Sequence, residues 1–170
     1  MREVQSFFLL PAVIAAVVFD LKKDRIPNWL ILYGLAAGWS FQLIKEQILG
    51  VFLFFGGAGI PILAGAFIYY FRMIGAGDIK LLAVAGGFMG PGEVIFCMAS
   101  SLFAGGILAM LLLLKRRNLQ ERIFYFFHYI REQKRTGEWK PYITEKDQSG
   151  RMHFSIAILA GILLYVGGVY

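Results

Sequence analysis

Long uncharged stretches separated by short charged ones are the main pattern of this chain. No charged residue occurs at positions 4–19, 29–44 or 48–71, and the stretch from 81 to 114 contains only Glu93. A further apolar segment begins near residue 152 and runs to the end. Because a helix of about 20 apolar residues crosses the hydrocarbon core of a bilayer, this pattern predicts several membrane-spanning helices.

The predicted helices cover residues 4–20, 28–44, 48–71, 78–89, 93–114 and 152–170. The stretch 81–114 is divided at Gly90-Pro91-Gly92, because one straight helix of that length would be roughly 50 Å long. The helix over 78–89 is then about 18 Å long, too short to cross alone. A cleaved signal peptide is the alternative for the first segment, but no small-x-small site follows it. We expect one all-α domain over residues 1–170, with six transmembrane helices.

Composition supports an integral membrane protein. The chain is 58% hydrophobic and 16% charged, whereas soluble domains carry about 25% charged residues. Its net charge of +6 comes from basic residues between the apolar stretches, so membrane topology explains it, and no nucleic-acid partner is expected. Cys97 is the single cysteine, which excludes an intramolecular disulfide or a cysteine-rich zinc site.

The basic residues predict the orientation of the chain. All of them except Arg2 and Lys45 lie in the loops 20–28, 72–80 and 115–151. Six spans place these three loops on one side of the membrane, and the positive-inside rule assigns that side to the cytoplasm. Both termini are therefore expected to be extracytoplasmic. The basic loop 115–151 begins with an apolar helical face, which predicts a helix lying on the membrane surface or on the protein's own loops. That face consists of Leu119, Ile123, Phe126, Phe127 and Ile130.

Asp20 and Asp78 stand at the cytoplasmic ends of the first and fourth predicted helices. A charge at a helix centre in the membrane costs about 2.5–3.5 kcal/mol, so such a carboxylate suggests a functional site. Two carboxyl groups in one low-dielectric site do not both ionise readily. One then keeps a proton while the other activates a water for attack on a peptide carbonyl. Helix capping and loop solvation are the other interpretations. Gly75 and Gly77 allow the backbone to turn tightly and approach a substrate.

The residues around both aspartates resemble those of a known protease family. Gly75-Ala76-Gly77-Asp78 resembles the Gly-x-Gly-Asp signature of the intramembrane aspartyl proteases, and Ile79-Lys80 continue it as in the type IV prepilin peptidases. Asp20-Leu21-Lys22, followed by Ile26-Pro27-Asn28, is similar to that family's other aspartate motif. The resemblance covers nearly the whole chain except the 115–151 loop. It is greatest to the short single-domain peptidases of tight-adherence (Flp) pilus systems.

This resemblance implies an aspartic endopeptidase that removes the short basic leader of type IV prepilin-like precursors at the cytoplasmic membrane face. The implied catalytic residues are Asp20 and Asp78, and the supporting motif residues are Gly75, Gly77, Lys80, Pro27 and Asn28. No cofactor or metal is expected. The implied setting is a prokaryotic cytoplasmic (inner) membrane, with prepilin-like substrates, the lipid bilayer and pilus or secretion assembly proteins as partners. Larger family members add N-methylation through a cysteine zinc domain, which this one-cysteine chain is expected to lack.

Several other polar residues have two interpretations. Asp24 is the alternative to Asp20, but it lies among basic residues in a loop, and the motif spacing favours Asp20. Lys80 either orients a carboxylate or anchors the chain on the positive side of the membrane. His128 and His153 have no partner at metal-ligand spacing and are interpreted as structural residues.

Four other functions remain open at this point. An archaeal-type preflagellin peptidase has the same motifs. A protease of the presenilin or signal-peptide-peptidase type would also carry Tyr-Asp and Pro-Ala-Leu motifs, and neither occurs here. A small transporter would use Asp20 and Asp78 as intramembrane carboxylates without cleaving a peptide. A non-enzymatic assembly subunit would tolerate asparagine at both positions.

Overall fold

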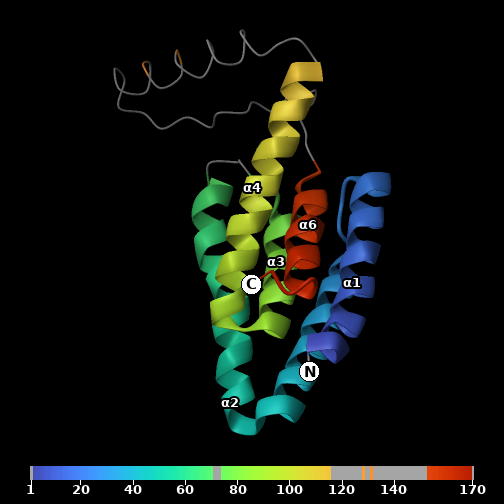
Figure 1. Cartoon of the computed structure of the whole chain (residues 1–170), viewed down its shortest axis with the longest axis vertical. Helices are drawn as coiled ribbons and strands as arrows, with labels where there is room; N and C mark the ends of the chain where they lie inside the picture. Colours follow the sequence, from blue (N-terminus) through green and yellow to red (C-terminus); the bar gives the residue numbers. More distant parts are fainter. Residues whose placement is uncertain (1, 71–73, 116–127, 129–130, 132–152, 170) are drawn as a thin grey trace.

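The protein is all-helical in the part of the chain that the computed structural model describes, residues 2–70, 74–115, 128, 131 and 153–169. The helices are α1 (Arg2–Lys23), α2 (Asn28–Tyr70), α3 (Ala76–Met89), α4 (Pro91–Lys115) and α6 (Phe154–Val166). Figure 1 shows them packed side by side as one bundle. The prediction of an all-α chain is confirmed. The predicted amphipathic helix of the 115–151 loop falls almost entirely outside the described residues.

Helix α2 is one long helix with a sharp break inside it. Gln47 has φ 51° and ψ −127°, which lie outside the helical region and reverse the direction of the chain. The two halves of α2 form a hairpin whose turn lies at the bottom of Figure 1. The sequence predicted two helices here, at 28–44 and 48–71, and the structure joins them through this kink.

The helix ends near the two aspartates differ slightly from the predicted ones. Helix α1 continues past Asp20 to Lys23, and the backbone N–H of Asp24 still donates to the Asp20 carbonyl at 2.9 Å. Helix α3 begins at Ala76, two residues before Asp78. Asp20 therefore lies in the last turn of α1, and Asp78 lies in the first turn of α3.

A tight turn at Gly90 joins α3 to α4. Its φ of 85° favours glycine, and its N–H donates to the Gly86 carbonyl at 2.8 Å. Helix α4 starts directly afterwards at Pro91 and not at the predicted Glu93, because a proline in the first helical position loses no hydrogen bond. At the other end of the described chain, α6 is shorter than the predicted helix over 152–170.

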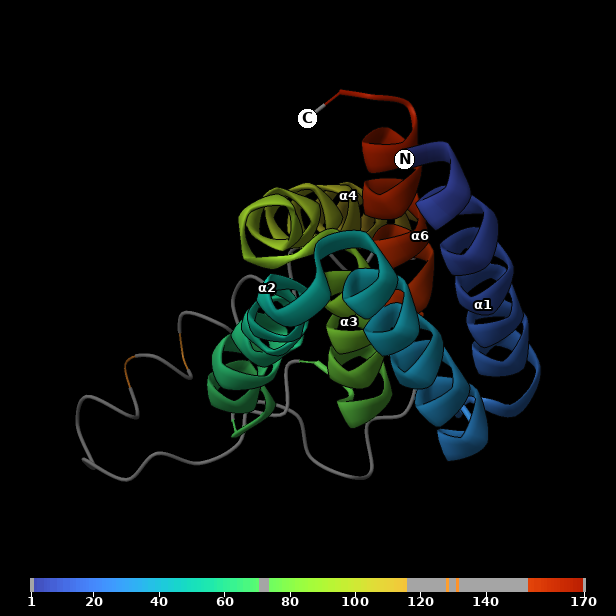
Figure 2. The same ribbon diagram turned by 90° about the horizontal axis from the view of Figure 1, so that it is seen from below.

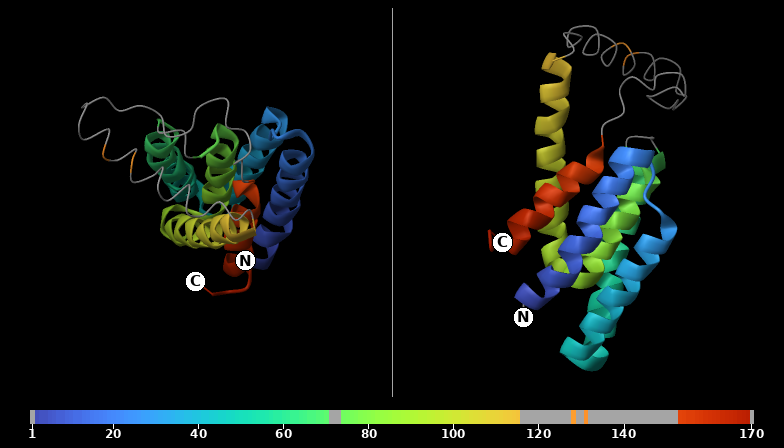
Figure 3. Two further views of the ribbon diagram at one scale, coloured as in Figure 1. Left: turned by 90° about the horizontal axis from the view of Figure 1, so that it is seen from above. Right: turned by 90° about the vertical axis from the view of Figure 1, so that its right-hand side faces the viewer.

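Successive helices run in alternating directions through the bundle. Helices α1 and α4 and the second half of α2 end at the top of Figure 1, where α3 and α6 begin. Figure 3 shows the same arrangement from two further sides. We call this end of the bundle the aspartate end, since Asp20 and Asp78 lie there. The kink at Gln47 lies at the opposite end.

Three of the described helical segments are long and apolar enough to cross a membrane, by length and composition. They are Val4–Lys23, Asn28–Tyr70 and Pro91–Leu112. Large apolar side chains point outward from the bundle, including Ile44, Leu63 and Phe67, which are 84%, 78% and 71% exposed. Such an apolar exterior suits a lipid environment, where these side chains meet hydrocarbon and not water. The protein is thus built as a membrane protein.

Helix α3 forms the centre of the bundle (Figure 2). Every residue from 81 to 90 is buried. Small residues let α2 approach it closely: a Cβ added to Gly57 would collide with the Gly86 carbonyl oxygen, and one added to Gly34 would lie 2.7 Å from Val84. Close backbone approach through glycine is a common means of packing helices in membranes. Helix α3 therefore has a fixed position relative to α2.

Two glutamine side chains provide hydrogen bonds to the last turn of α3 inside the bundle. The amide nitrogens of Gln5 and Gln42 both donate to the Phe88 carbonyl oxygen. This carbonyl belongs to the last turn of α3, where no backbone N–H of the same helix is available to it. The hydroxyl of Tyr165 donates in turn to Gln5 Oε1 at 3.1 Å. Helices α1, α2 and α6 thereby supply the polar contacts that a short helix needs at a buried end.

Candidate active site

The two predicted catalytic aspartates lie near one another at the aspartate end. Asp20 comes from the last turn of α1 and Asp78 from the first turn of α3. The Asp78 carboxylate is close enough to Asp20 and to His153 to interact electrostatically with both. Both carboxylates are largely shielded from solvent, and the Asp20 side chain is 15% exposed. Residues 58 positions apart in sequence therefore contribute to one shielded site.

The start of α3 holds Asp78 in place. Gly75 precedes the helix in an extended conformation, with φ −73° and ψ 146°, and its carbonyl accepts the N–H of Asp78 at 3.1 Å. The Asp78 carboxylate accepts a hydrogen bond from the Gly75 backbone N–H in return. The Asp78 bond corresponds to one half of a capping box, in which the side chain at the third helical position reaches back to the N–H of the residue before the helix. The spacing of Gly75 and Asp78 in the motif thus has a direct structural reason.

Two side chains of the last described helix contact Asp20. The Ser155 hydroxyl donates to Asp20 Oδ2 at 2.6 Å, and His153 Nδ1 lies 3.3 Å from the same oxygen. Ser155 is fully buried. Within the described part of the chain, these are the hydrogen-bonding contacts of the Asp20 carboxylate. The first turn of α6 thus closes the site on the side of Asp20.

Asp24, the alternative to Asp20, has a different environment. Its side chain is 68% exposed, and its Oδ1 lies 3.9 Å from His153 Nε2. Its backbone has φ 51°, the left-handed conformation that commonly ends a helix. The geometry is that of a helix-terminating residue at the surface, whereas Asp20 is the shielded one of the two.

The other motif residues connect the start of α2 to the start of α3. Lys80 Nζ donates to Asn28 Oδ1 at 2.9 Å, so its partner is an amide and not a carboxylate. Asn28 is the first residue of α2, and the helix starts on the carbonyl of Pro27, which accepts the N–H of Leu30 at 3.1 Å. A Cβ on Gly77 would meet Ile26 at 3.5 Å, an ordinary contact distance. These residues hold two helix starts together beside the aspartates.

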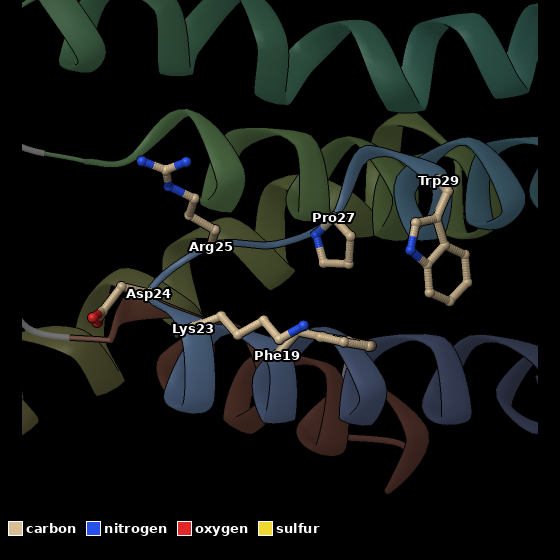
Figure 4. Close-up of a pocket in the computed structure, with 6 residues that line it drawn as sticks. All are labelled: Phe19, Lys23, Asp24, Arg25, Pro27 and Trp29. Carbon is tan, nitrogen blue, oxygen red and sulfur yellow. The ribbon is translucent and has the colours of Figure 1, made fainter.

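An open groove lies between the end of α1 and the start of α2 (Figure 4). It is lined by Phe19, Lys23, Asp24, Arg25, Pro27 and Trp29. The rings of Phe19 and Trp29 meet edge to face, with centroids 6.0 Å apart. Lys23 Nζ lies 5.7 Å from the centroid of the Phe19 ring, within the range of a cation–π contact. The groove has an apolar wall and basic groups at its edge.

The contacts of His153 and Ser155 were not predicted from the sequence. His153 was interpreted as a structural residue because it has no partner at metal-ligand spacing, and Ser155 was not singled out. The available signal was topology: the sixth predicted helix starts on the same side of the membrane as the end of the first. In the described residues no group of three or more His, Cys, Asp or Glu side chains is arranged to hold a metal ion. His128 is exposed.

Comparison with known protein families gives a match to this chain. Residues 7–110 match the model of the type IV leader peptidase family. The matched region includes both aspartates, most of α1 and all of α3, and it ends before His153 and Ser155. Comparison with curated proteins and with solved structures gave no significant match. The match covers more than half of the chain, so this protein belongs to the type IV leader peptidase family.

Proposed function

We propose that this protein is a membrane aspartyl endopeptidase that removes the short basic leader from type IV prepilin-like precursors. Asp20 and Asp78 are its catalytic pair, and cleavage takes place at the cytoplasmic face of a prokaryotic cytoplasmic membrane. The observation that carries the proposal is the meeting of these two carboxylates at one end of the bundle, in a chain of this peptidase family.

The chemistry requires one ionised and one protonated carboxyl group. The ionised group takes a proton from a water molecule as the water oxygen bonds to the peptide carbonyl carbon, and the other group gives its proton to the carbonyl oxygen. When the carbon–nitrogen bond breaks, the first group passes its proton to the departing amine. The second group recovers a proton from the hydroxyl of the tetrahedral intermediate. Both carboxyl groups then have their starting protonation states.

The proposed topology has six spans, with the aspartate end in the cytoplasm. Alternating helix directions and the kink of α2 at Gln47 support this count. The basic residues Lys22, Lys23 and Arg25 lie at the aspartate end, as the positive-inside rule requires of a cytoplasmic face. A prepilin leader is cut just before the hydrophobic helix of the substrate. That junction would meet the aspartates at the membrane edge, with the groove at Phe19 and Trp29 beside it.

We further propose that the activity is peptidase alone, without N-methyltransferase activity. The single cysteine, Cys97, is buried in α4 among apolar residues. A cysteine zinc site of the kind associated with methylation in larger family members needs several thiolates.

A cleavage assay in membranes tests the proposed function. The protein is co-expressed with a tagged prepilin-like precursor from the same genome, and leader removal is followed as a shift in precursor size. We expect the wild type to cleave, and Asp20→Asn and Asp78→Asn each to lower the rate by at least a hundredfold, because each removes one partner of the acid–base pair.

Two further variants serve as controls for this assay. Asp24→Asn should retain most activity, which separates the shielded aspartate from the exposed one. Glu46→Gln, at the opposite end of the bundle, should behave as wild type. Undiminished cleavage by both Asp20→Asn and Asp78→Asn at normal protein levels would rule out the aspartyl mechanism.

A further inference from the structure

We infer that Ser155 and His153 are positioning residues for Asp20, and that their contacts make Asp20 the general base of the pair. The inference rests on the proposed peptidase function and adds to it Ser155 of α6 and His153 directly before α6, both outside the part of the chain that matches the family model. Its basis is the set of contacts at the first turn of α6.

Both contacts reach the same oxygen of Asp20. Ser155 Oγ donates to Oδ2 at 2.6 Å, and His153 Nδ1 lies 3.3 Å from Oδ2. Hydrogen bonds from the described residues thus leave Oδ1 unoccupied. Two contacts to one oxygen restrict the movement of the carboxylate, and its second oxygen stays available to accept a proton from water.

The polar side chains at the start of α6 contact Asp20 and do not cap the backbone of α6. His153 occupies the position before the first helical residue and makes no side-chain capping bond to α6. Side-chain caps come from the residue before the helix, which here is His153. Ser155, the second helical residue, donates its hydroxyl to a carboxylate of another helix. The positive end of the α6 dipole lies on the same side and also favours a negative charge there.

These donors distinguish the two aspartates. Hydrogen bonds to an ionised carboxylate favour that form. The Ser155 hydroxyl donates to Asp20, and His153 Nδ1, 3.3 Å from the same oxygen, donates in the tautomer that carries its proton there. Asp78 accepts the Gly75 backbone N–H and lies close enough to both Asp20 and His153 to interact electrostatically with them, but no side-chain hydroxyl of the described residues donates to it. When only one of two neighbouring carboxyl groups ionises, the group with more donors holds the charge. Asp20 Oδ1 therefore takes the water proton, and Asp78 supplies the proton to the substrate carbonyl.

His153 also bridges to the surface. Its Nδ1 faces Asp20, and its Nε2 lies 3.9 Å from Asp24 Oδ1. The ring lies between two carboxylates, with the closer contact on the side of Asp20, and its side chain is 32% exposed. Asparagine at position 153 can place an N–H donor near the position of Nδ1, whereas alanine cannot.

Steady-state kinetics on the purified full-length protein in detergent test this inference, with the tagged prepilin-like precursor as the probe. The variants are Ser155→Ala, His153→Ala and His153→Asn. We expect Ser155→Ala and His153→Ala each to lower kcat at least tenfold and to change KM less than twofold, since positioning of a base acts on the chemical step. His153→Asn should recover most of the kcat lost in His153→Ala.

Ser100→Ala is the matched control, because it removes a serine hydroxyl bonded to the Cys97 carbonyl of α4. It should keep the wild-type kcat. Thermal unfolding of each variant identifies losses that come from misfolding, and the comparison of His153→Asn with His153→Ala stays informative if Ser155→Ala is unstable. A normal kcat in both alanine variants, with Asp20→Asn inactive, would overturn the inference and leave the peptidase function intact. A wild type that does not cleave would overturn both.

Discussion

At the scale of single residues, the backbone N–H of Gly75 holds the Asp78 carboxylate, and this contact explains why position 75 is a glycine. Asp78 reaches back to the N–H of Gly75, and a Cβ at position 75 would lie 3.1 Å from Asp78 Oδ2. That distance is too tight for an unperturbed contact. Glycine at position 75 therefore leaves the carboxylate free to adopt its capping position.

Gly75→Ala is expected to displace the Asp78 carboxylate and lower kcat about tenfold or more, since small misplacements of catalytic groups are costly. The fold should be little affected, because the crowded atom is the end of a side chain. Kinetics on the tagged precursor and a thermal unfolding curve measure the two effects. Gly106→Ala, where an added Cβ meets nothing within 4 Å, is the control. Equal kcat in the two variants would contradict this role of Gly75.

The sequence predicted that Asp20 and Asp78 lie at the same end of the bundle, but it did not predict the side chains that contact them. Asp20 and Asp78 were identified by their motifs and by the membrane side of their helices. The contacts of Ser155 and Lys80 depend on how α6 and α3 are rotated and packed, and sequence spacing within one chain segment carries no information on that. Lys80 bonds to Asn28 and not to a carboxylate, a choice that only the three-dimensional arrangement decides.

At the scale of elements, α3 is the helix on which the site depends. It was predicted as a short helix over 78–89, and it is about 21 Å long at 1.5 Å per residue. Its length could be predicted from the turn at Gly90 and Pro91. The two hydrogen bonds to the Phe88 carbonyl could not be predicted. Gln5 and Gln42 come from helices α1 and α2, so their common target was not visible in the sequence.

Gln5→Leu combined with Gln42→Leu should destabilise the protein by about 1–3 kcal/mol, because the Phe88 carbonyl is then buried without these donors. Each single variant should cost less, since one donor remains. Unfolding in detergent, followed by loss of helical signal, measures the difference. Ser40→Ala is the control, because its hydroxyl is exposed and bonds to its own helix at the Ala36 carbonyl. A double variant as stable as Ser40→Ala would show that the glutamines do not stabilise α3.

At the scale of the whole molecule, the distribution of basic residues and the directions of the helices support the same proposed orientation in the membrane. The aspartate end carries Lys22, Lys23 and Arg25, whereas Lys45 lies beside Glu46 near the kink at the other end. This separation of charge, together with the alternating helices, is the basis of the proposed orientation.

Labelling with a membrane-impermeant thiol reagent tests that orientation. In a protein with Cys97→Ala, a cysteine at Lys22 should be labelled in inverted vesicles and protected in intact cells. A cysteine at Lys45 should show the reverse. Both positions are exposed on the bundle, so access depends on the side of the membrane. Labelling of both cysteines from the same side would contradict the six-span arrangement.

The bond between Ser155 and Asp20 joins residues 135 positions apart, and this has a consequence for biosynthesis. The ribosome releases both aspartates, on α1 and α3, well before it completes α6. Under the proposed roles, the nascent chain holds an acid–base pair whose base is not yet fixed. Full proteolytic activity would then begin only when α6 docks, so a half-made enzyme in the insertion machinery would cut the proteins around it slowly.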